Sequence, residues 1–214
     1  MLFKPSVLKK YKIIGESHYN APKLPDDLKF AKTPREKKYL AIINTLLETA
    51  RQDPMTGLSH KEHFTTVNEG KGVYIAIDGD GLKKLNDSFG HDAGHAAILC
   101  IADGIKATVR TTRGDEVTHT TRSGGDEFIV FLPNAPLSVG VTVAKRILES
   151  VRSQKISKHY AGDTETKAKL DAIKLSVSIG VGYSFKDADK AQYRAKENGR
   201  NRVEFYRYAK DEMH

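Results

Sequence analysis

Two short acidic stretches flanked by glycines have residue types that suit metal-assisted chemistry. Residues 78–81 read Asp-Gly-Asp-Gly and follow the apolar run 73–77, and residues 124–127 read Gly-Gly-Asp-Glu and precede the apolar run 128–132. Carboxylates at a strand end can hold Mg²⁺, which binds oxygen ligands, usually one or two carboxylates together with substrate phosphates. If both stretches lie at one edge of a sheet, they predict metal-assisted phosphoryl or nucleotidyl transfer.

Each acidic stretch also has a purely structural interpretation. Residues 124–127 would then form a solvated turn between two antiparallel strands, with glycines that allow positive φ. Asp80 would serve only as the N-cap of a short helix over residues 81–87. The residues by themselves leave these alternatives open.

Apolar periodicity predicts the elements that position these acids. Helices are expected over residues 34–52, 92–110, 137–153 and 187–198. Gly199 suits the position just after the C-cap of the last of them. Strands are expected over residues 73–77, 118–122, 128–132, 175–183 and 202–208. The polar segment 154–172 is expected to hold an extra helical turn, and residues 1–32 show no clear period. Helices and hairpins around one sheet favour an α+β fold.

The first predicted helix has a clear start signal. Residues 33–36 read Thr-Pro-Arg-Glu, which is the pattern of a capping box with proline at the first helical position. The helix carries an apolar stripe made of Tyr39, Leu40, Ile42, Ile43, Leu46, Leu47 and Ala50. That stripe would pack either on the chain's own domain or on a second copy of the helix.

Composition is typical of a soluble globular protein with one domain and an extension, since 214 residues include 39% hydrophobic and 29% charged residues. No apolar run approaches the roughly 18–20 residues that a membrane span needs. The N-terminus has no signal-peptide core, so the cytoplasm is the expected location.

Cys100 is the only cysteine and lies in an apolar helical pattern, which predicts a buried thiol.

The positive charge is concentrated near the N-terminus. Of the net charge of +8, residues 1–52 contribute most, with eleven Lys and Arg against five Asp and Glu. A basic arm of this kind is either solvated or directed at an anionic partner. It lacks the interleaved aromatic residues that stack on bases, so nucleic acid is an unlikely partner.

Six motifs in order resemble the GGDEF domain of diguanylate cyclases. They lie at residues 53–58, 78–87, 90–94, 124–128, 178–181 and 187–202. The resemblance implies a palm-like α+β fold with a central, mostly antiparallel sheet flanked by helices. It divides the chain into a basic N-terminal extension and linker helix, residues 1–52, and a GGDEF domain, residues 53–210.

The resemblance also implies a reaction in which two GTP molecules become cyclic di-GMP and two pyrophosphates. Each domain of a homodimer would hold one nucleotide, with Mg²⁺ or Mn²⁺ as cofactor. The implied metal ligands are Asp78, Gly79 through its carbonyl, Asp126 and Glu127. The implied catalytic residues are Asp126, Glu127 and Lys83, and the implied substrate-binding residues are Gly81, Leu82, Asn86, His95, Lys196 and Arg200. Lys196 and Arg200 are spaced i, i+4 at the end of the last expected helix, so they are expected to share one face.

The sequence departs from the family pattern at the base-recognition position. His95 stands where the family motif Gly-His-x-x-Gly-Asp ends in aspartate. A carboxylate can accept two hydrogen bonds from guanine, whereas a neutral imidazole accepts one. His95 therefore either binds guanine in a modified way or weakens the preference for GTP.

The family's inhibitory motif, Arg-x-x-Asp, is not in register, because the nearest match at residues 113–116 lies too far upstream and ends in glutamate. Weak or absent feedback inhibition is therefore expected.

An idle nucleotide-binding or partner-docking domain is the alternative function. A nucleic-acid polymerase is disfavoured by the absence of fingers-like or thumb-like segments.

Overall fold

The computed structural model of the chain describes residues 33–50, 52–60, 71–112 and 119–206. A six-stranded mixed sheet forms its centre, in the order β1-β3-β4-β2-β5-β6. The strands are β1 (Ser59–His60), β2 (Gly72–Gly79), β3 (His119–Gly124), β4 (Glu127–Pro133), β5 (Val177–Gly182) and β6 (Arg202–Phe205). The inner pairs are antiparallel and both edge pairs are parallel. The expected α+β fold with a mostly antiparallel sheet is confirmed.

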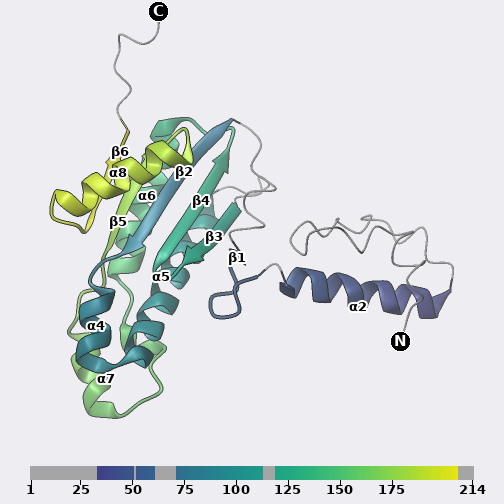
Figure 1. Cartoon of the computed structure of the whole chain (residues 1–214), viewed down its shortest axis with the longest axis horizontal. Helices are drawn as coiled ribbons and strands as arrows, with labels where there is room; N and C mark the ends of the chain where they lie inside the picture. Colours follow the sequence, from purple (N-terminus) through teal and green to yellow (C-terminus); the bar gives the residue numbers. More distant parts are fainter. Residues whose placement is uncertain (1–32, 51, 61–70, 113–118, 207–214) are drawn as a thin grey trace, which may run out of the picture.

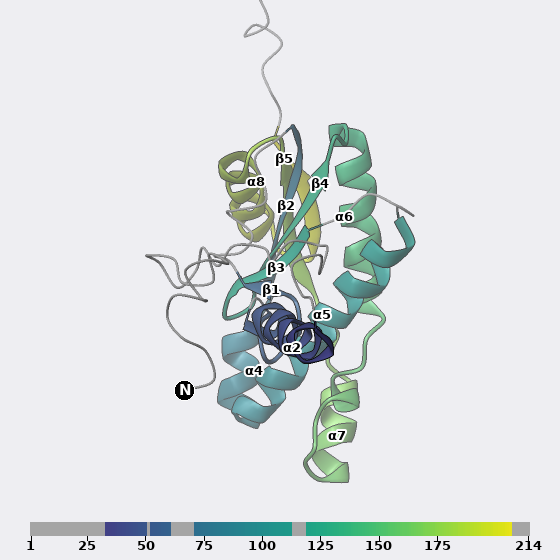
Figure 2. The ribbon, with the colours of Figure 1, turned by 90° about the vertical axis from the view of Figure 1, so that its right-hand side faces the viewer.

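Helices cover both faces of the sheet, as Figures 1 and 2 show. The helices α5 (His91–Thr112) and α6 (Leu137–Arg152) lie on one face, and α8 (Phe185–Glu197) lies on the other. Between β2 and α5 lies the short helix α4 (Leu82–Phe89). The core includes Ile75, Ile101, Ile147 and Ile179, all at most 1% exposed. Cys100 is fully buried, as expected, and burial raises the pKa of its thiol to about 11.

The first described helix is α2 (Pro34–Ala50), and its capping box forms as predicted. The backbone N–H of Thr33 donates to Oε2 of Glu36 at 2.9 Å, and the N–H of Glu36 donates to Oγ1 of Thr33 at 3.2 Å. Figure 1 shows α2 projecting from the rest of the molecule. Ile42, on the predicted apolar stripe, is 46% exposed. At this residue the stripe is not packed on the chain's own domain.

The polar segment after α6 holds more structure than the extra turn expected. It contains the 3₁₀ turn η2 (Ile156–Lys158) and the helix α7 (Thr164–Asp171). Ile156 and Leu170 are fully buried and anchor the segment. Nε2 of His159 also lies 2.8 Å from a carboxylate oxygen of Asp103 on α5. Apolar periodicity could not predict these two elements, because only two side chains of the segment are fully buried.

The helix α4 was expected only in the purely structural interpretation of Asp80, and the other differences concern the ends of elements and the short strand β1. The edge strand β1 was not predicted, since two residues carry no detectable period. The expectations for residues 1–32 and for the motif at 113–116 lie outside the described residues. No described helix is both long and apolar enough to cross a membrane.

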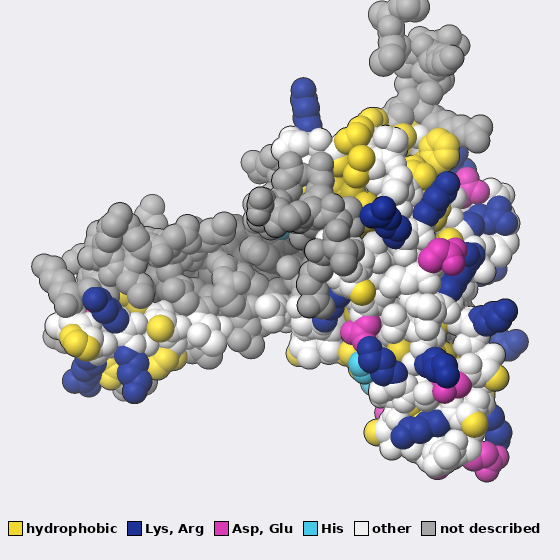
Figure 3. Space-filling view, turned by 180° about the vertical axis from the view of Figure 1, so that it is seen from behind, with side chains coloured by type: hydrophobic (Ala, Val, Ile, Leu, Met, Phe, Trp, Pro, Cys, Tyr) yellow, Lys and Arg dark blue, Asp and Glu magenta, His cyan; other side chains and the backbone are white. Residues whose placement is uncertain are grey.

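Charged side chains are mixed on the face seen from behind. Figure 3 shows Lys and Arg side chains spread over this face and interspersed with Asp and Glu. A nucleic-acid surface normally gathers basic residues along one face or stripe. This face of the described domain therefore gives no support to nucleic-acid binding.

Candidate active site

A pocket of about 660 Å³ opens where β2 ends and α4 begins. Most of the residues expected at the site line it, namely Asp78, Gly79, Gly81, Leu82, Lys83, Asp126, Lys196 and Arg200. Three residues that were not assigned to the site also line it, namely Asp80, Lys84 and Asp87. Four cations and four carboxylates thus meet in one pocket, which suits a polyanionic ligand bound together with a metal ion.

The two acidic stretches lie side by side, as predicted. Strands β3 and β4 form a hairpin whose loop is Gly125-Asp126, and Gly125 adopts the positive φ of 44°. The backbone N–H of Gly79 donates to the carbonyl of Asp126 at 3.1 Å. A methyl group on Gly79 would lie 3.1 Å from Cβ of Asp126, so glycine allows this close approach.

Asp78 is the carboxylate of the site whose ionisation is most strongly perturbed. The residue is 9% exposed, and burial raises the pKa of its carboxyl group. Lys196 opposes this shift through an ion pair, with Nζ 2.7 Å from Oδ2 of Asp78. The negative charges of Asp126 and Glu127 raise the pKa of Asp78 further. A cation between these acids would relieve the repulsion.

The donor set fits a metal ion that arrives with phosphate. Among the described residues, no three His, Cys, Asp or Glu side chains come close enough to form a metal cage. Mg²⁺ is usually bound by one or two carboxylates and by substrate phosphates rather than by an all-protein cage. Asp78 and Asp126 in a pocket lined by lysine and arginine match that mode of binding.

Glu127 lies apart from the large pocket. It is exposed and lines a small cavity of about 40 Å³ next to α8, together with Asp78, Ser123, Asp189 and Gln192. Asp78 lines both spaces, whereas Glu127 lines only the small one. Its expected role as a metal ligand stays a prediction.

Asp80 is not the helix cap that the structural alternative proposed. The N-cap of α4 is Gly81, with φ 74° and no side-chain cap. Asp80 instead accepts hydrogen bonds from the hydroxyls of Ser176 at 2.8 Å and Ser178 at 2.7 Å. It also accepts one from the backbone N–H of Asn201 at 2.9 Å. Its carboxylate thus ties the β2–α4 loop to β5 and to the turn after α8.

Lys196 and Arg200 both reach the pocket, but not as neighbours on one helix face. The helix α8 ends at Glu197, with Gly199 at the position after its C-cap, as predicted. Arg200 follows the helix end and has a left-handed φ of 62°. The expectation that an i, i+4 spacing places both residues on one helical face was therefore wrong, because the helix ends between them.

The two residues expected to recognise the base, Asn86 and His95, do not line the pocket. Asn86 is half-buried on α4, and its Oδ1 is buried without a hydrogen-bond partner in the described part of the chain. A Cβ at Gly94 would lie 1.9 Å from that oxygen, so the first turn of α5 packs directly on the Asn86 carboxamide. His95, the next residue, is exposed on α5.

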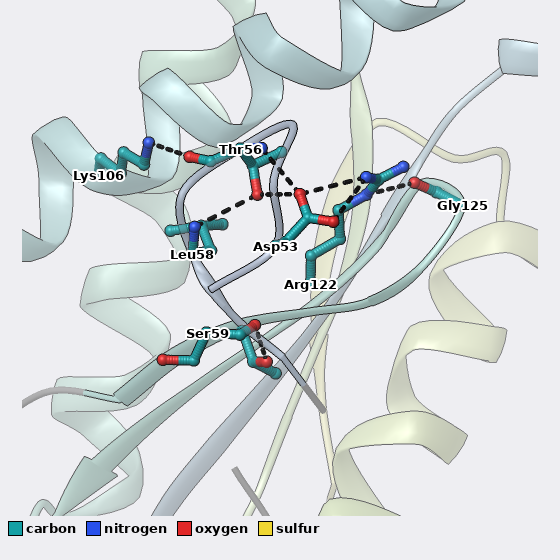
Figure 4. Close-up of polar contacts among 8 residues, drawn as sticks. Asp53, Thr56, Leu58, Ser59, Lys106, Arg122 and Gly125 are labelled. Carbon is teal, nitrogen blue, oxygen red and sulfur yellow. Dashed lines mark hydrogen bonds and ion pairs between the residues drawn. The ribbon is translucent and has the colours of Figure 1, made fainter. Parts of the chain in front are cut away.

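A turn before β1 holds the hairpin that carries Asp126, as shown in Figure 4. Oδ1 of Asp53 accepts hydrogen bonds from the N–H and the hydroxyl of Thr56, both at 2.7 Å. Nη1 of Arg122 lies 3.1 Å from Oδ2 of Asp53, and Nε of Arg122 donates to the carbonyl of Gly125 at 2.9 Å. Lys106 also donates to the carbonyl of Thr56. Sequence analysis did not assign these positioning roles to Asp53 and Arg122, which lie 69 residues apart.

The Asp53 contacts predict a pH-dependent loss of stability in Asp53→Asn. Burial favours a higher pKa for Asp53, but the hydrogen bonds of Thr56 and the charge of Arg122 outweigh it, so the net pKa is lowered. The stabilisation is therefore full above the unfolded pKa, near pH 4, and is lost as pH falls through the lower folded pKa. Urea unfolding should show a loss of about 1–3 kcal/mol at pH 7. A difference that stays constant down to pH 2 would contradict this assignment.

The fold is an α+β domain whose pocket gathers carboxylates and cations at the start of α4, and comparison with known proteins identifies its family. The family description "Diguanylate cyclase, GGDEF domain" matches residues 50–202. The chain is 37% identical to Diguanylate cyclase A of Treponema denticola over 188 residues, which cover 77% of this chain and 47% of that protein. It is 33% identical to Diguanylate cyclase DgcM of Escherichia coli over 177 residues, which cover 74% and 39%. The chain therefore belongs to the GGDEF family.

Solved structures agree with this assignment. Diguanylate cyclase SiaD of Pseudomonas aeruginosa, determined in complex with its activator SiaC, matches with a TM-score of 0.61 and 26% identity. The match covers 80% of this chain and 68% of that one. The chain spans less than half the length of the two curated relatives named above, so the activity of those whole proteins does not transfer directly.

Proposed function

We propose that this chain is a diguanylate cyclase, which condenses two GTP molecules into cyclic di-GMP and releases two pyrophosphates. The observation that carries the proposal is the pocket in which Asp78 and Asp126 face Lys83, Lys196 and Arg200 at the start of α4. Two acids can hold a divalent cation, while three cations balance a triphosphate. Such an arrangement suits attack on an α-phosphate with pyrophosphate as the leaving group.

The residues of the chain have separate tasks in this reaction. Asp78, Asp126 and the carbonyl of Gly79 would hold Mg²⁺ or Mn²⁺, which supplies charge neutralisation at the triphosphate when bound. Lys83 is exposed at the pocket and acts as a mobile point charge for the phosphates. Lys196 and Arg200 bind the remaining phosphate charge.

The residues proposed to accept the hydroxyl proton and to hold the base lie outside the pocket lining. Glu127 lines the small cavity that Asp78 also lines, and it is the candidate acceptor for the proton that leaves the attacking 3′-hydroxyl. The candidates for guanine recognition are Asn86 on α4 and His95 on α5, the two residues at the matching positions of the family pattern. These two residues would hold the base while the cations hold the phosphates.

The proposal is tested by identifying products. Purified protein is incubated with Mg²⁺ and each nucleoside triphosphate, alone and in pairs, and the products are identified by mass. Cyclic di-GMP and pyrophosphate from GTP in a ratio of one to two are expected. Bound but unchanged GTP would instead indicate an idle nucleotide-binding domain, and a mixed or adenine cyclic dinucleotide would indicate altered base specificity.

Catalysis should require two copies of the chain. One pocket holds one nucleotide, and the attacking 3′-hydroxyl belongs to the other, so specific activity should rise with protein concentration until dimers saturate. If the α2 stripe stabilises that dimer, Ile42→Glu should lower activity most at low concentration, because Ile42 is an exposed apolar residue. The control Ala41→Glu adds the same charge beside the stripe. Activity that is independent of concentration in the wild-type protein would contradict the two-copy requirement.

A further inference from the structure

The turn that carries Arg200 has an unusual backbone. Gly199, Arg200 and Asn201 have positive φ values of 106°, 62° and 49°. Glycine adopts this region readily, whereas two successive residues with side chains rarely do. Such conformations persist only where the surrounding structure holds them in place, and they are frequent at functional sites.

Asn201 is held at its backbone N–H, its carbonyl and its side-chain oxygen. Its N–H donates to Oδ2 of Asp80 at 2.9 Å. From the last turn of α6, Arg152 donates through Nε to Oδ1 of Asn201 at 2.8 Å and through Nη2 to its carbonyl at 2.9 Å. The planar guanidinium fork makes both bonds at once, which a lysine could not do.

Asp80 is itself held in place by Ser176 and Ser178, at and just before the start of β5. Its two carboxylate oxygens accept the hydroxyls of Ser176 and Ser178, and its N–H donates to the carbonyl of Ser176 at 3.0 Å. Ser178 is fully buried within β5. The strained turn is therefore clamped between the sheet on one side and α6 on the other.

We propose that Arg152 and Asp80 are positioning residues for triphosphate binding. They hold Asn201, and Asn201 in turn fixes the backbone that directs Arg200 into the pocket. Arg152 does not line that pocket, so it acts on the ligand only through the turn. The inference rests on the proposed function only in taking the occupant to be a nucleoside triphosphate.

A binding experiment separates this role from catalysis. The probe is 3′-deoxyGTP with Mg²⁺, which lacks the attacking hydroxyl and so cannot be cyclised, and binding is measured by calorimetry. Arg152→Ala should weaken binding by about tenfold, the worth of one charge-assisted contact to phosphate. Arg152→Lys should weaken it almost as much, because it retains the charge and loses the fork. Inorganic tripolyphosphate should show the same loss, since the contact concerns phosphate and not the base.

Two controls exclude long-range charge and general destabilisation. Arg146→Ala removes one exposed positive charge from the same helix and should bind within about twofold of wild type. Asp80→Ala should weaken binding at least as much as Arg152→Ala. Asp80→Asn should recover most of the affinity, since one amide oxygen can accept from both Asn201 and Ser176 while the amide nitrogen donates to Ser178.

The outcomes distinguish this inference from the proposed function. Cyclic di-GMP formation with equal 3′-deoxyGTP affinity in Arg152→Ala and Arg146→Ala would overturn the positioning role and leave the function intact. Weakened binding in Arg152→Ala without any cyclic product from wild type would support the positioning role and overturn the function. Failure of the wild-type protein to bind either 3′-deoxyGTP or tripolyphosphate would overturn both.

Discussion

Replacing Asp126 by alanine should abolish cyclic di-GMP formation while leaving the fold intact. Asp126 occupies the two-residue loop of the β3–β4 hairpin and lies over Gly79, next to the buried Asp78. Removing one of two carboxylates that hold the cation takes away charge stabilisation in the transition state, and we expect a loss of at least about a thousandfold in kcat. The measurement is the initial rate of cyclic di-GMP formation at saturating GTP and Mg²⁺.

The thermal stability of Asp126→Ala should be equal to that of wild type or slightly higher. The charge of Asp126 raises the pKa of Asp78, so the two carboxylates repel each other when no metal is bound. A matched control is Glu165→Ala, which removes an exposed carboxylate from α7, a helix that does not line the pocket. Unchanged turnover in Asp126→Ala would refute its place in the metal site.

Much of the site could be predicted because its signals are local. An apolar run that ends in Asp-Gly and another that begins after Gly-Gly-Asp-Glu define strand ends and a tight turn without any long-range information. The capping box at Thr33 and the glycine at position 199 are likewise local signals, and both were confirmed. The pairing of β2 with β4 then brings the two acidic stretches together.

The interactions that sequence analysis missed connect distant parts of the chain. The partners of Asp80 lie 96, 98 and 121 residues further along, so nothing in residues 78–81 distinguishes this role from a helix cap. Arg200 lies outside the helix for a similar reason. Its left-handed backbone is held by Arg152 and Asp80 through Asn201, and the local spacing of Lys196 and Arg200 carries no sign of this.

The sequence pattern predicts which residues recognise the base, but not how each of them would contact it. The pattern singled out Asn86 and His95, and the structure gives Asn86 a buried acceptor oxygen without a partner in the described residues. A side chain at Gly94 would force the Asn86 carboxamide to move, because a Cβ there would lie 1.9 Å from its oxygen. What His95 contributes depends on the direction of an exposed imidazole relative to the bound base, which neither residue type nor spacing determines.

Restoring an acid at position 95 should therefore sharpen the choice of base. In His95→Asp, the carboxylate can accept hydrogen bonds from both N1–H and the 2-amino group of guanine, whereas neutral imidazole accepts one and adenine offers neither of these donors. One added hydrogen bond is worth about 1–3 kcal/mol, so the ratio of kcat/KM for GTP over that for ATP should rise by about tenfold or more. The matched control is His91→Asp, which adds the same charge at an exposed position one turn earlier on α5 and should leave the ratio unchanged. A wild-type protein that already excludes ATP, with a flat ratio in His95→Asp, would show that His95 is a working guanine contact or points away from the base.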